Sequence, residues 1–184
     1  EMVLVVRRED GFKHIGQLKG KRLMVHDSRL LEPAYLWLGT VLTRNKLPER
    51  ERFFGSVREV KKASQAVLPV FFKQADVCLV GKSAFETMIE LNPQIGKEMM
   101  SFLSSDRFLK ALFCLNKNLS ANVKAEIIAS ALSLSTSTMG RQVLTLFQTE
   151  AILPFRPSML DTTVTLLDDI NNPRGRLLVK RRRE

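Results

Sequence analysis

The feature that most constrains the fold is the apolar strand-like run DVCLV, Asp76 to Val80, followed at once by a helical pattern from Lys82 to Leu91. A continuous apolar strand is typical of a sheet that helices cover on both faces. Two other short strands precede it, Met2 to Arg7 and Arg22 to His26, the second entered through a turn at Gly20. The first part of the chain is therefore predicted to alternate strands and helices.

The remaining segments of this first part are predicted from their periodicity and turn residues. Pro33 suits the first turn of a mostly apolar helix that runs to about Asn45. A short strand at Arg52 to Gly55 and a helix from Val57 to Gln74, kinked by its proline, are expected next. Two further strand candidates are Phe102 to Ser104 and the apolar stretch Leu109 to Leu115.

After Leu115 the pattern changes to helices alone. Ser120 is a good N-cap for a helix whose inward-facing residues are predicted to be Val123, Ile127, Ala131 and Leu134, and two more helices are predicted at 138–148 and 157–170. These helices need a sheet to cover, and the chain supplies too few strands. The sequence also opens directly into a strand, so we expect a preceding segment to be missing. Apolar surface should be exposed unless that segment, in cis or from a second chain, covers it.

Composition bounds the class of protein. Of 184 residues, 45% are hydrophobic and 26% charged, as expected of a globular chain. The net charge of +10 owes +5 to the last eleven residues, so the body is only mildly basic, and the tail from 171 to 184 lacks the interleaved aromatics of a nucleic-acid-binding segment. The longest uncharged stretch, 127 to 140, is too short to span a bilayer, and we find no signal peptide.

The sequence has few residues or motifs that indicate catalysis or metal binding. Cys78 and Cys114 each lie in an apolar run and are predicted to be buried thiols, although a disulfide between them stays open. His14 and His26 are too few and too far apart to suggest a metal site. The sequence has no Gly-rich nucleotide loop, nucleophile elbow or spaced carboxylate pair, so we expect neither an enzyme nor a cofactor.

Four motifs, in order, resemble the middle and C-terminal parts of the phosphate/phosphonate-type periplasmic binding proteins of ABC transporters. They are VLVVRREDGFKHIGQLKGKRLMVHD (3–27), PAYLWLGTVLTRNKL (33–47), KASQAVLPVFFKQADVCLVGKSAFETM (62–88) and FLKALFCLNKNLSANVKAEIIASALSLS (108–135). The third motif is the most specific, with a Gly-Gln-Ala-Asp-like turn at Lys73 to Asp76. Order and spacing together carry the resemblance.

The resemblance implies an α/β fold of the type 2 periplasmic-binding-protein kind, with two lobes of helices packed on mixed sheets. Residues 16–108 would form the second lobe. Residues 2–8 and 109–170 would belong to a first lobe that is incomplete, and 171–184 would be a basic tail. A small ligand would bind between the lobes and close them about a hinge.

The ligand site implied by the resemblance lies at strand C-termini and helix N-termini, where backbone N–H groups favour an anion. The residues at equivalent places are Asp27, Ser28, Arg29, Glu32, Tyr35, Lys82, Ser83, Asp106 and Arg107. Arg29 and Lys82 would bind a phosphate or carboxylate by charge. The same residues are also what solvated loops contain.

The chain departs from the family pattern at several places. Glu32 would repel an anion at its helix start, Lys62-Ala63 stands where relatives have Ser-His, and Lys110 replaces an acidic residue. The expected function is a solute receptor in the periplasm that works with an ABC permease or a sensor partner and not with nucleic acid. The alternatives are a sensory domain of a signalling protein and an effector domain of a transcription regulator, because one fold serves all three.

Overall fold

A computed structural model describes residues 1–27, 31–109, 111–147, 149 and 151–171, without the side chains of residues 31, 32 and 169–171. It divides into two compact units. The first consists of residues 1–110 together with 160–184, and the second of residues 111–159.

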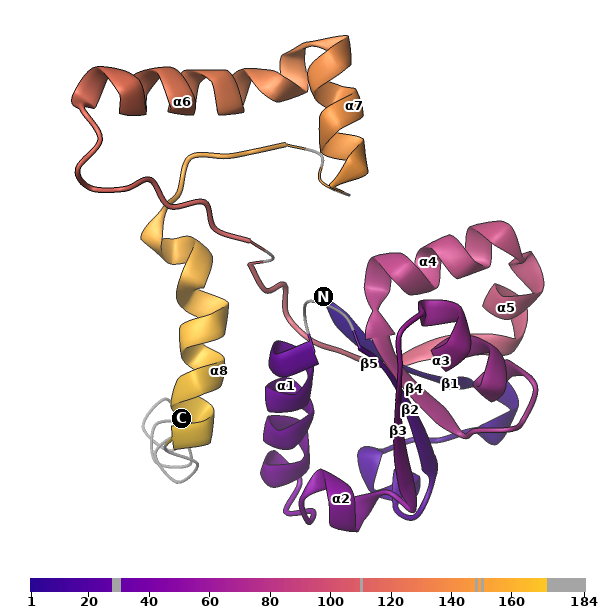
Figure 1. The fold of residues 1–184 in the computed structure, drawn as a ribbon. Helices are drawn as coiled ribbons and strands as arrows, with labels where there is room; N and C mark the ends of the chain where they lie inside the picture. Colours follow the sequence, from indigo (N-terminus) through magenta and orange to yellow (C-terminus); the bar gives the residue numbers. More distant parts are fainter. Residues whose placement is uncertain (28–30, 110, 148, 150, 172–184) are drawn as a thin grey trace, which may run out of the picture. The chain divides into compact units, whose positions relative to one another are not determined.

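The first unit is built on a five-stranded sheet (Figure 1). Its strands are β1 (Met2–Arg7), β2 (Arg22–His26), β3 (Ser56–Val60), β4 (Val77–Gly81) and β5 (Met99–Ser104). The order across the sheet is β3-β2-β4-β1-β5. Strand β2 is parallel to β3 and β4, whereas β1 is antiparallel to β4 and β5. The predicted mixed α/β fold is confirmed.

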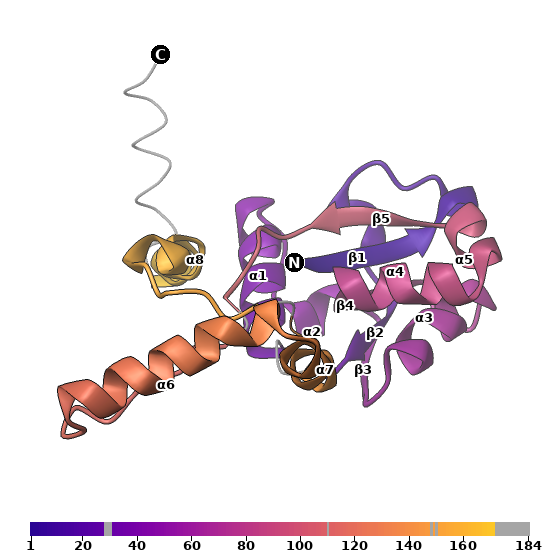
Figure 2. The same cartoon turned by 90° about the horizontal axis from the view of Figure 1, so that it is seen from above.

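Helices cover both faces of this sheet, as the apolar strands predicted (Figure 2). They are α1 (Leu31–Arg44), α2 (Arg50–Phe53), α3 (Ala63–Phe71), α4 (Lys82–Leu91), α5 (Pro93–Glu98) and α8 (Asp161–Asn171). Alternate residues of each strand face opposite ways, so Leu23 and Val25 pack in the core beside α1, while Met24 packs in the core beside α3 and α4. Every residue of β1 is buried.

The turn before β2 depends on two glycines. Gly20 has a φ of +73°, which L-residues with a side chain rarely adopt. The backbone N–H of Gly20 donates to the carbonyl of Phe53, and that of Gly55 to Lys21, so the two loops lie side by side. A Cβ at Gly55 would lie 2.3 Å from the Gly20 carbonyl oxygen. The predicted Gly20 turn is confirmed.

Two strand predictions were wrong. Residues 50–53 form the short helix α2, and the strand lies at Ser56–Val60, inside the segment predicted as helix. β3 is an edge strand of sequence SVREV with mostly exposed side chains, so it lacks the apolar run that marks the buried strands. Leu109–Leu115 forms no strand at its described residues, where Leu112 and Phe113 are exposed. An apolar run becomes a strand only when another strand supplies hydrogen bonds, and this one has none there.

Residues 2–8 were expected to belong to the first lobe, but β1 lies in the same sheet as the strands expected in the second lobe. β1 hydrogen-bonds to β4 on one side and β5 on the other, so it lies between two strands of the predicted second lobe. Its uniformly apolar side chains suit that interior position. Helix α8, which was also expected in the first lobe, packs against α1 in the same unit.

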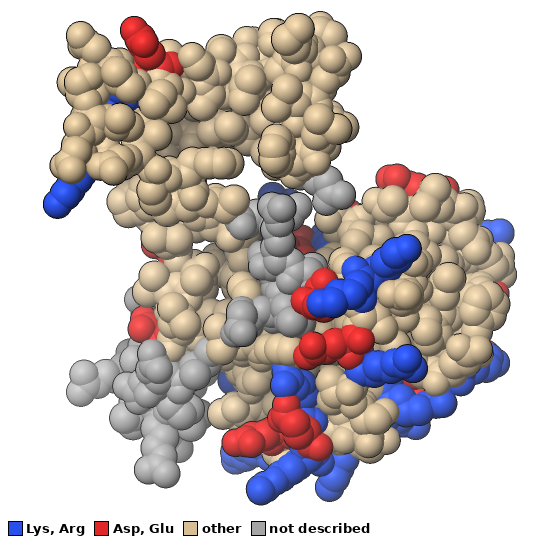
Figure 3. Space-filling model, viewed as in Figure 1, with Lys and Arg blue, Asp and Glu red and all other residues tan. Residues whose placement is uncertain are grey.

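The second unit contains α6 (Ala121–Ser133), a 3-10 turn (Leu134–Thr136) and α7 (Thr138–Leu146). The Ser120 cap is confirmed, because its Oγ accepts a hydrogen bond from the Val123 N–H. No residue of α6 is buried: Val123 and Ile127, on the face predicted to point inward, are 41% and 40% exposed, in line with the expected exposure of apolar surface on these helices. Figure 3 shows few charges on this unit, whereas acidic and basic side chains intermingle on the sheet unit.

The described part of the chain has no helix long and apolar enough to cross a membrane. It also holds no group of three or more His, Cys, Asp or Glu side chains that could bind a metal ion. Both cysteines are free; Cys78 is buried as predicted, but Cys114 is exposed because its predicted strand does not form.

Candidate functional site

The polar edge of the sheet brings together three of the predicted site residues, Asp27, Lys82 and Ser83. Because β2, β3, β4 and β5 run the same way, they all end at this edge, and antiparallel β1 begins there. His26 is opposite Val60, Met2 is opposite Gly81, and Val3 is opposite Ser104. The residues that immediately follow or precede these positions therefore form one cluster, which we call the sheet-edge site: Glu1, Asp27, Lys61, Lys82, Ser83 and Ser105.

Asp27 follows β2 and binds the residue that follows β3. Its backbone N–H donates to the Val60 carbonyl at 2.8 Å, and its carboxylate forms a hydrogen-bonded ion pair with the Lys61 ammonium. This hydrogen bond raises the pKa of Lys61 above its usual value. The Lys61 side chain is 85% exposed and that of Asp27 only 25%, so the carboxylate is held in place while the lysine can move.

Lys82 begins α4 and contacts the start of β1. Its Nζ lies 3.1 Å from Glu1 Oε2, and its backbone N–H donates to the Glu1 carbonyl at 3.0 Å. Gly81 precedes the helix and supplies no side-chain cap. The next two backbone N–H groups, of Ser83 and Ala84, have no acceptor among the described residues.

The Tyr35 side chain already contacts two other residues of the protein, Glu59 and Arg50. Its hydroxyl donates a hydrogen bond to Glu59 Oε1, and the Arg50 guanidinium lies 3.5 Å from the centre of its ring. Burial, followed by the hydrogen bond to Glu59, raises the pKa of the phenol. The ring connects α1, α2 and β3, which is a structural role.

The remaining predicted residues divide into three groups. Ser28 and Arg29 lie outside the described residues, as does Lys110, and of Glu32 only the backbone is described, in the first turn of α1. Arg107 is exposed and has no hydrogen bond or ion pair with another described residue. Asp106 follows Ser105, whose Oγ accepts from the Met2 N–H at 2.8 Å and donates to the Asp106 carbonyl at 2.7 Å. Asp106 is therefore tied to the sheet edge by its backbone.

Four residues of the edge were missed by sequence reasoning: Glu1, His26, Lys61 and Ser105. Lys61 would have been found if β3 had been placed at 56–60, because it follows that strand directly. Glu1 enters only through the antiparallel pairing of β1 with β4, which has no local signal. His26 ends β2 half-buried, and its Nδ1 is buried without a hydrogen-bond partner among the described residues.

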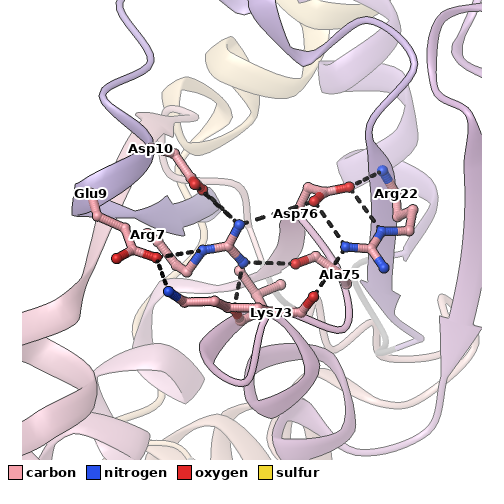
Figure 4. Close-up of polar contacts among 8 residues, drawn as sticks. Arg7, Glu9, Asp10, Arg22, Lys73, Ala75 and Asp76 are labelled. Atoms are coloured by element: carbon pink, nitrogen blue, oxygen red, sulfur yellow. Dashed lines mark hydrogen bonds and ion pairs between the residues drawn. The ribbon is translucent and has the colours of Figure 1, made fainter.

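The opposite edge of the sheet carries a dense ion-pair network around Arg7 (Figure 4). The Arg7 guanidinium is buried; its Nη1 donates to the carbonyls of Val70 and Ala75 at 2.7 and 2.8 Å, and its Nη2 lies 3.0 Å from Asp10 Oδ2. These bonds tie the end of β1 to the turn between α3 and β4. In that turn Lys73 has a φ of +62° at the position where the family resemblance has glycine.

Asp76 completes this network from the start of β4. Arg22 forms a two-pronged pair with it, Nε to Oδ2 and Nη2 to Oδ1, both at 3.0 Å, and the Arg22 backbone N–H donates to Oδ2 at 2.8 Å. The hydrogen bond from the Arg22 side chain lowers the pKa of Asp76 below its ordinary value. These bonds give this edge of the sheet a structural role, although Arg7 Nε and Asp10 Oδ2 are buried without a hydrogen-bond partner among the described residues.

A mixed sheet covered by helices on both faces, with a cluster of charges and open helix amides at one edge, is the architecture of a type 2 periplasmic-binding lobe, the fold of the solved structures described below. Residues 1–160 match the family described as the periplasmic phosphonate substrate-binding protein of ABC transporters, and the chain belongs to that family. The family is one of binding components and not of enzymes. No curated protein sequence matches the chain.

Solved structures support the fold. XAC2383 from Xanthomonas citri, bound to ATP, has a TM-score of 0.71 at 15% identity over 93% of this chain and 66% of that one. PhnD1 from Prochlorococcus marinus, in complex with methylphosphonate, has a TM-score of 0.61 at 14% identity over 92% and 66%. A phosphonate transporter binding protein, PA3383 from Pseudomonas aeruginosa, gives 0.59 at 15% over 90% and 55%. The chain thus spans less than two thirds of the length of these proteins.

Proposed function

We propose that this chain is the solute-recognition part of an extracytoplasmic receptor of an ABC transporter, and that a small anionic ligand binds at the sheet-edge site. In the whole protein the ligand would be enclosed by hinge closure, and the closed form would be presented to a permease. The periplasm is the compartment that the family membership supports for this role.

The observation that carries the proposal is the start of α4. The N–H groups of Ser83 and Ala84 lack acceptors, and they lie at the positive end of a ten-residue helix. A helix N-terminus of this kind favours an anion, because unpaired N–H groups and the helix dipole act together. The Lys82 ammonium, 44% exposed, adds a positive charge beside these amides.

The two ion pairs of the edge set a condition on binding. Lys82 is paired with Glu1 and Lys61 with Asp27, so the described charges of the cluster cancel. An anion must compete with Glu1 and Asp27 for the lysines. Exposed ion pairs contribute only about 0–1 kcal/mol each, so such an exchange costs little. Phosphonates, phosphate esters and carboxylates are the ligand classes that this site would accept.

A thermal-shift screen of the full-length protein tests the proposal, since a ligand that binds only the folded state raises its stability. The panel contains methylphosphonate, inorganic phosphate, ATP and succinate as anions, and trimethylammonium as a cation. We expect the melting temperature to rise with at least one anion and not with the cation.

A pair of matched variants locates the site. Lys82→Met should abolish the ligand-induced rise, whereas Lys97→Met, which removes an exposed lysine of α5, should leave it unchanged. A rise with the cation alone, or an anion effect that survives Lys82→Met, would contradict the proposal.

A further inference from the structure

Strand β3 forms one edge of the sheet, because β2 is its only neighbour in the strand order (Figures 1 and 2). Val60 lies opposite His26, and the Val60 carbonyl accepts from the N–H of Asp27. Bonded residues alternate along a parallel pair, so the residues of β3 that bond to β2 are Ser56, Arg58 and Val60. The N–H and C=O groups of Val57 and Glu59 therefore point outward, and they have no backbone partner among the described residues.

A groove of about 340 Å³ runs between β3 and helix α3. Its apolar lining consists of Met24, Val60, Leu68, Pro69 and Phe72. The Phe72 side chain is 61% exposed, and large aromatic side chains that stay open to solvent in a groove are typical of binding surfaces. A free strand edge beside an apolar groove suits β-strand addition, in which the backbone of a partner segment pairs with the edge and its alternate side chains enter the groove.

Arg58 gives the groove its charge. It is the one ionisable side chain of the lining, and no described residue forms a hydrogen bond or ion pair with it. Lys62, just before α3, is exposed and also has no ion pair with a described residue. Glu59, the acidic residue of β3, bonds to Tyr35 on the other face of the sheet. The groove side of β3 is therefore basic and complementary to a carboxylate.

The sequence of β3 disfavours a second copy of this chain as the occupant. Two identical edges related by a two-fold axis pair antiparallel, with outward residues opposite one another. One such register sets Arg58 against its own copy and another sets Glu59 against its own copy, so both oppose like charges. The remaining register, centred on Val57, extends the pairing to Gly55, which lies outside the strand. None of these registers places a carboxylate opposite Arg58.

We propose that β3 and this groove bind an extended acidic segment of a partner protein, which adds a strand to the sheet beside β3. The backbone of the segment would pair with the outward N–H and C=O groups of Val57 and Glu59. On the groove side, the segment would place a carboxylate beside Arg58 and an apolar side chain against Leu68 and Phe72. This surface shares no residue with the sheet-edge site, so the proposal goes beyond solute binding.

A labelled peptide tests the proposal directly. In the capped, fluorescein-labelled hexapeptide Thr-Glu-Thr-Leu-Thr-Glu, one face of the extended chain carries both glutamates and the leucine. Titration with the full-length protein should raise the fluorescence anisotropy of this peptide to saturation. The charge-reversed peptide Thr-Lys-Thr-Leu-Thr-Lys should not bind, because its ammonium groups would face Arg58. No saturable rise with the acidic peptide, or equal affinity for the two peptides, overturns the proposal.

N-methylation of the peptide tests strand addition without any change to the protein. Alternate N–H groups of a paired strand point toward its neighbour, and the others point away. Two acidic peptides, one methylated at the odd-numbered nitrogens and one at the even-numbered nitrogens, should therefore differ: one should bind like the parent peptide and the other should not bind. An equal effect of the two methylation patterns would show that the peptide does not bind as a strand.

Variants of the protein locate the groove. Arg58→Glu should weaken binding of the acidic peptide by about tenfold or more, and should bind the lysine peptide instead. Arg8→Glu makes the same charge change at an exposed arginine outside the groove, so it should leave the affinity unchanged. Val57→Pro removes an outward N–H but no bond to β2, a change that edge strands tolerate, and should abolish binding. An unchanged affinity in Arg58→Glu contradicts the proposal.

Two further measurements separate this surface from the other possibilities. Lys82→Met should leave peptide binding unaltered, whether or not it abolishes the thermal shift with anions. Sedimentation velocity of the protein alone should show no self-association that depends on β3. A dimer that forms with rising concentration and is lost in Val57→Pro would mean that a second copy covers β3, and would overturn the proposal of an acidic partner.

Discussion

Replacement of Arg7 by methionine removes the centre of the ion-pair network while keeping a side chain of similar length. The guanidinium is buried, and its loss leaves the carbonyls of Val70 and Ala75 without their side-chain donor and the Asp10 carboxylate without its closest cation. The Val70 carbonyl still accepts from the Lys73 N–H at 3.2 Å, but a buried acceptor left with no donor costs about 1–3 kcal/mol, and a carboxylate more. Methionine recovers part of this by packing, so we expect a loss of about 3–4 kcal/mol.

Urea unfolding followed by far-UV circular dichroism measures this loss as a lower midpoint at unchanged slope. Arg8→Met is the control, because Arg8 is exposed and makes one hydrogen bond, at 3.3 Å, to the Gly96 carbonyl. Its variant should lose less than about 1 kcal/mol. If Arg7→Met were no more destabilising than Arg8→Met, the view that this edge of the sheet depends on a buried arginine would be refuted.

Three further predictions concern backbone strain, acid stability and thiol chemistry. Lys46 has a φ of +57° just after α1, where glycine is less strained than lysine. Lys46→Gly should therefore raise the free energy of unfolding in urea by about 0.5–1 kcal/mol, and a lower free energy of unfolding would show that the lysine backbone is not strained. Asp76 has a lowered pKa owing to Arg22, so its stabilisation is present above the ordinary value of 3.8 and lost as the pH falls through the folded pKa. In the Asp76→Asn variant the urea midpoint should therefore fall less steeply between about pH 4 and about pH 2 than in the unmodified protein. An equally steep fall would count against the ion pair of Asp76 with Arg22. Of the two thiols, exposed Cys114 should react with a thiol reagent in the native state and Cys78, whose pKa burial raises, only after unfolding; two rapid reactions would disprove the burial of Cys78.

Local patterns were enough for the interior of the sheet. β1, β2 and helix α4 have the predicted bounds, because an apolar run and an amphipathic repeat are each visible within a few residues. The Ser120 cap and the Gly20 turn were equally local. Of the site, Asp27 and Lys82 were placed correctly at the sheet edge, since each directly follows a predicted strand.

The sequence by itself determined which segments must be buried, and with them the mixed α/β class. Only the tertiary structure decided what those segments meet. Strand β3, with its exposed SVREV sequence, exists because β2 pairs with it, and the run at Leu109–Leu115 is no strand where the structure describes it because nothing pairs with it there. The ion pair of Glu1 with Lys82 and the groove that Met24 lines with Phe72 join residues far apart in the chain. Such contacts depend on strand order and helix packing, which no single stretch of sequence contains.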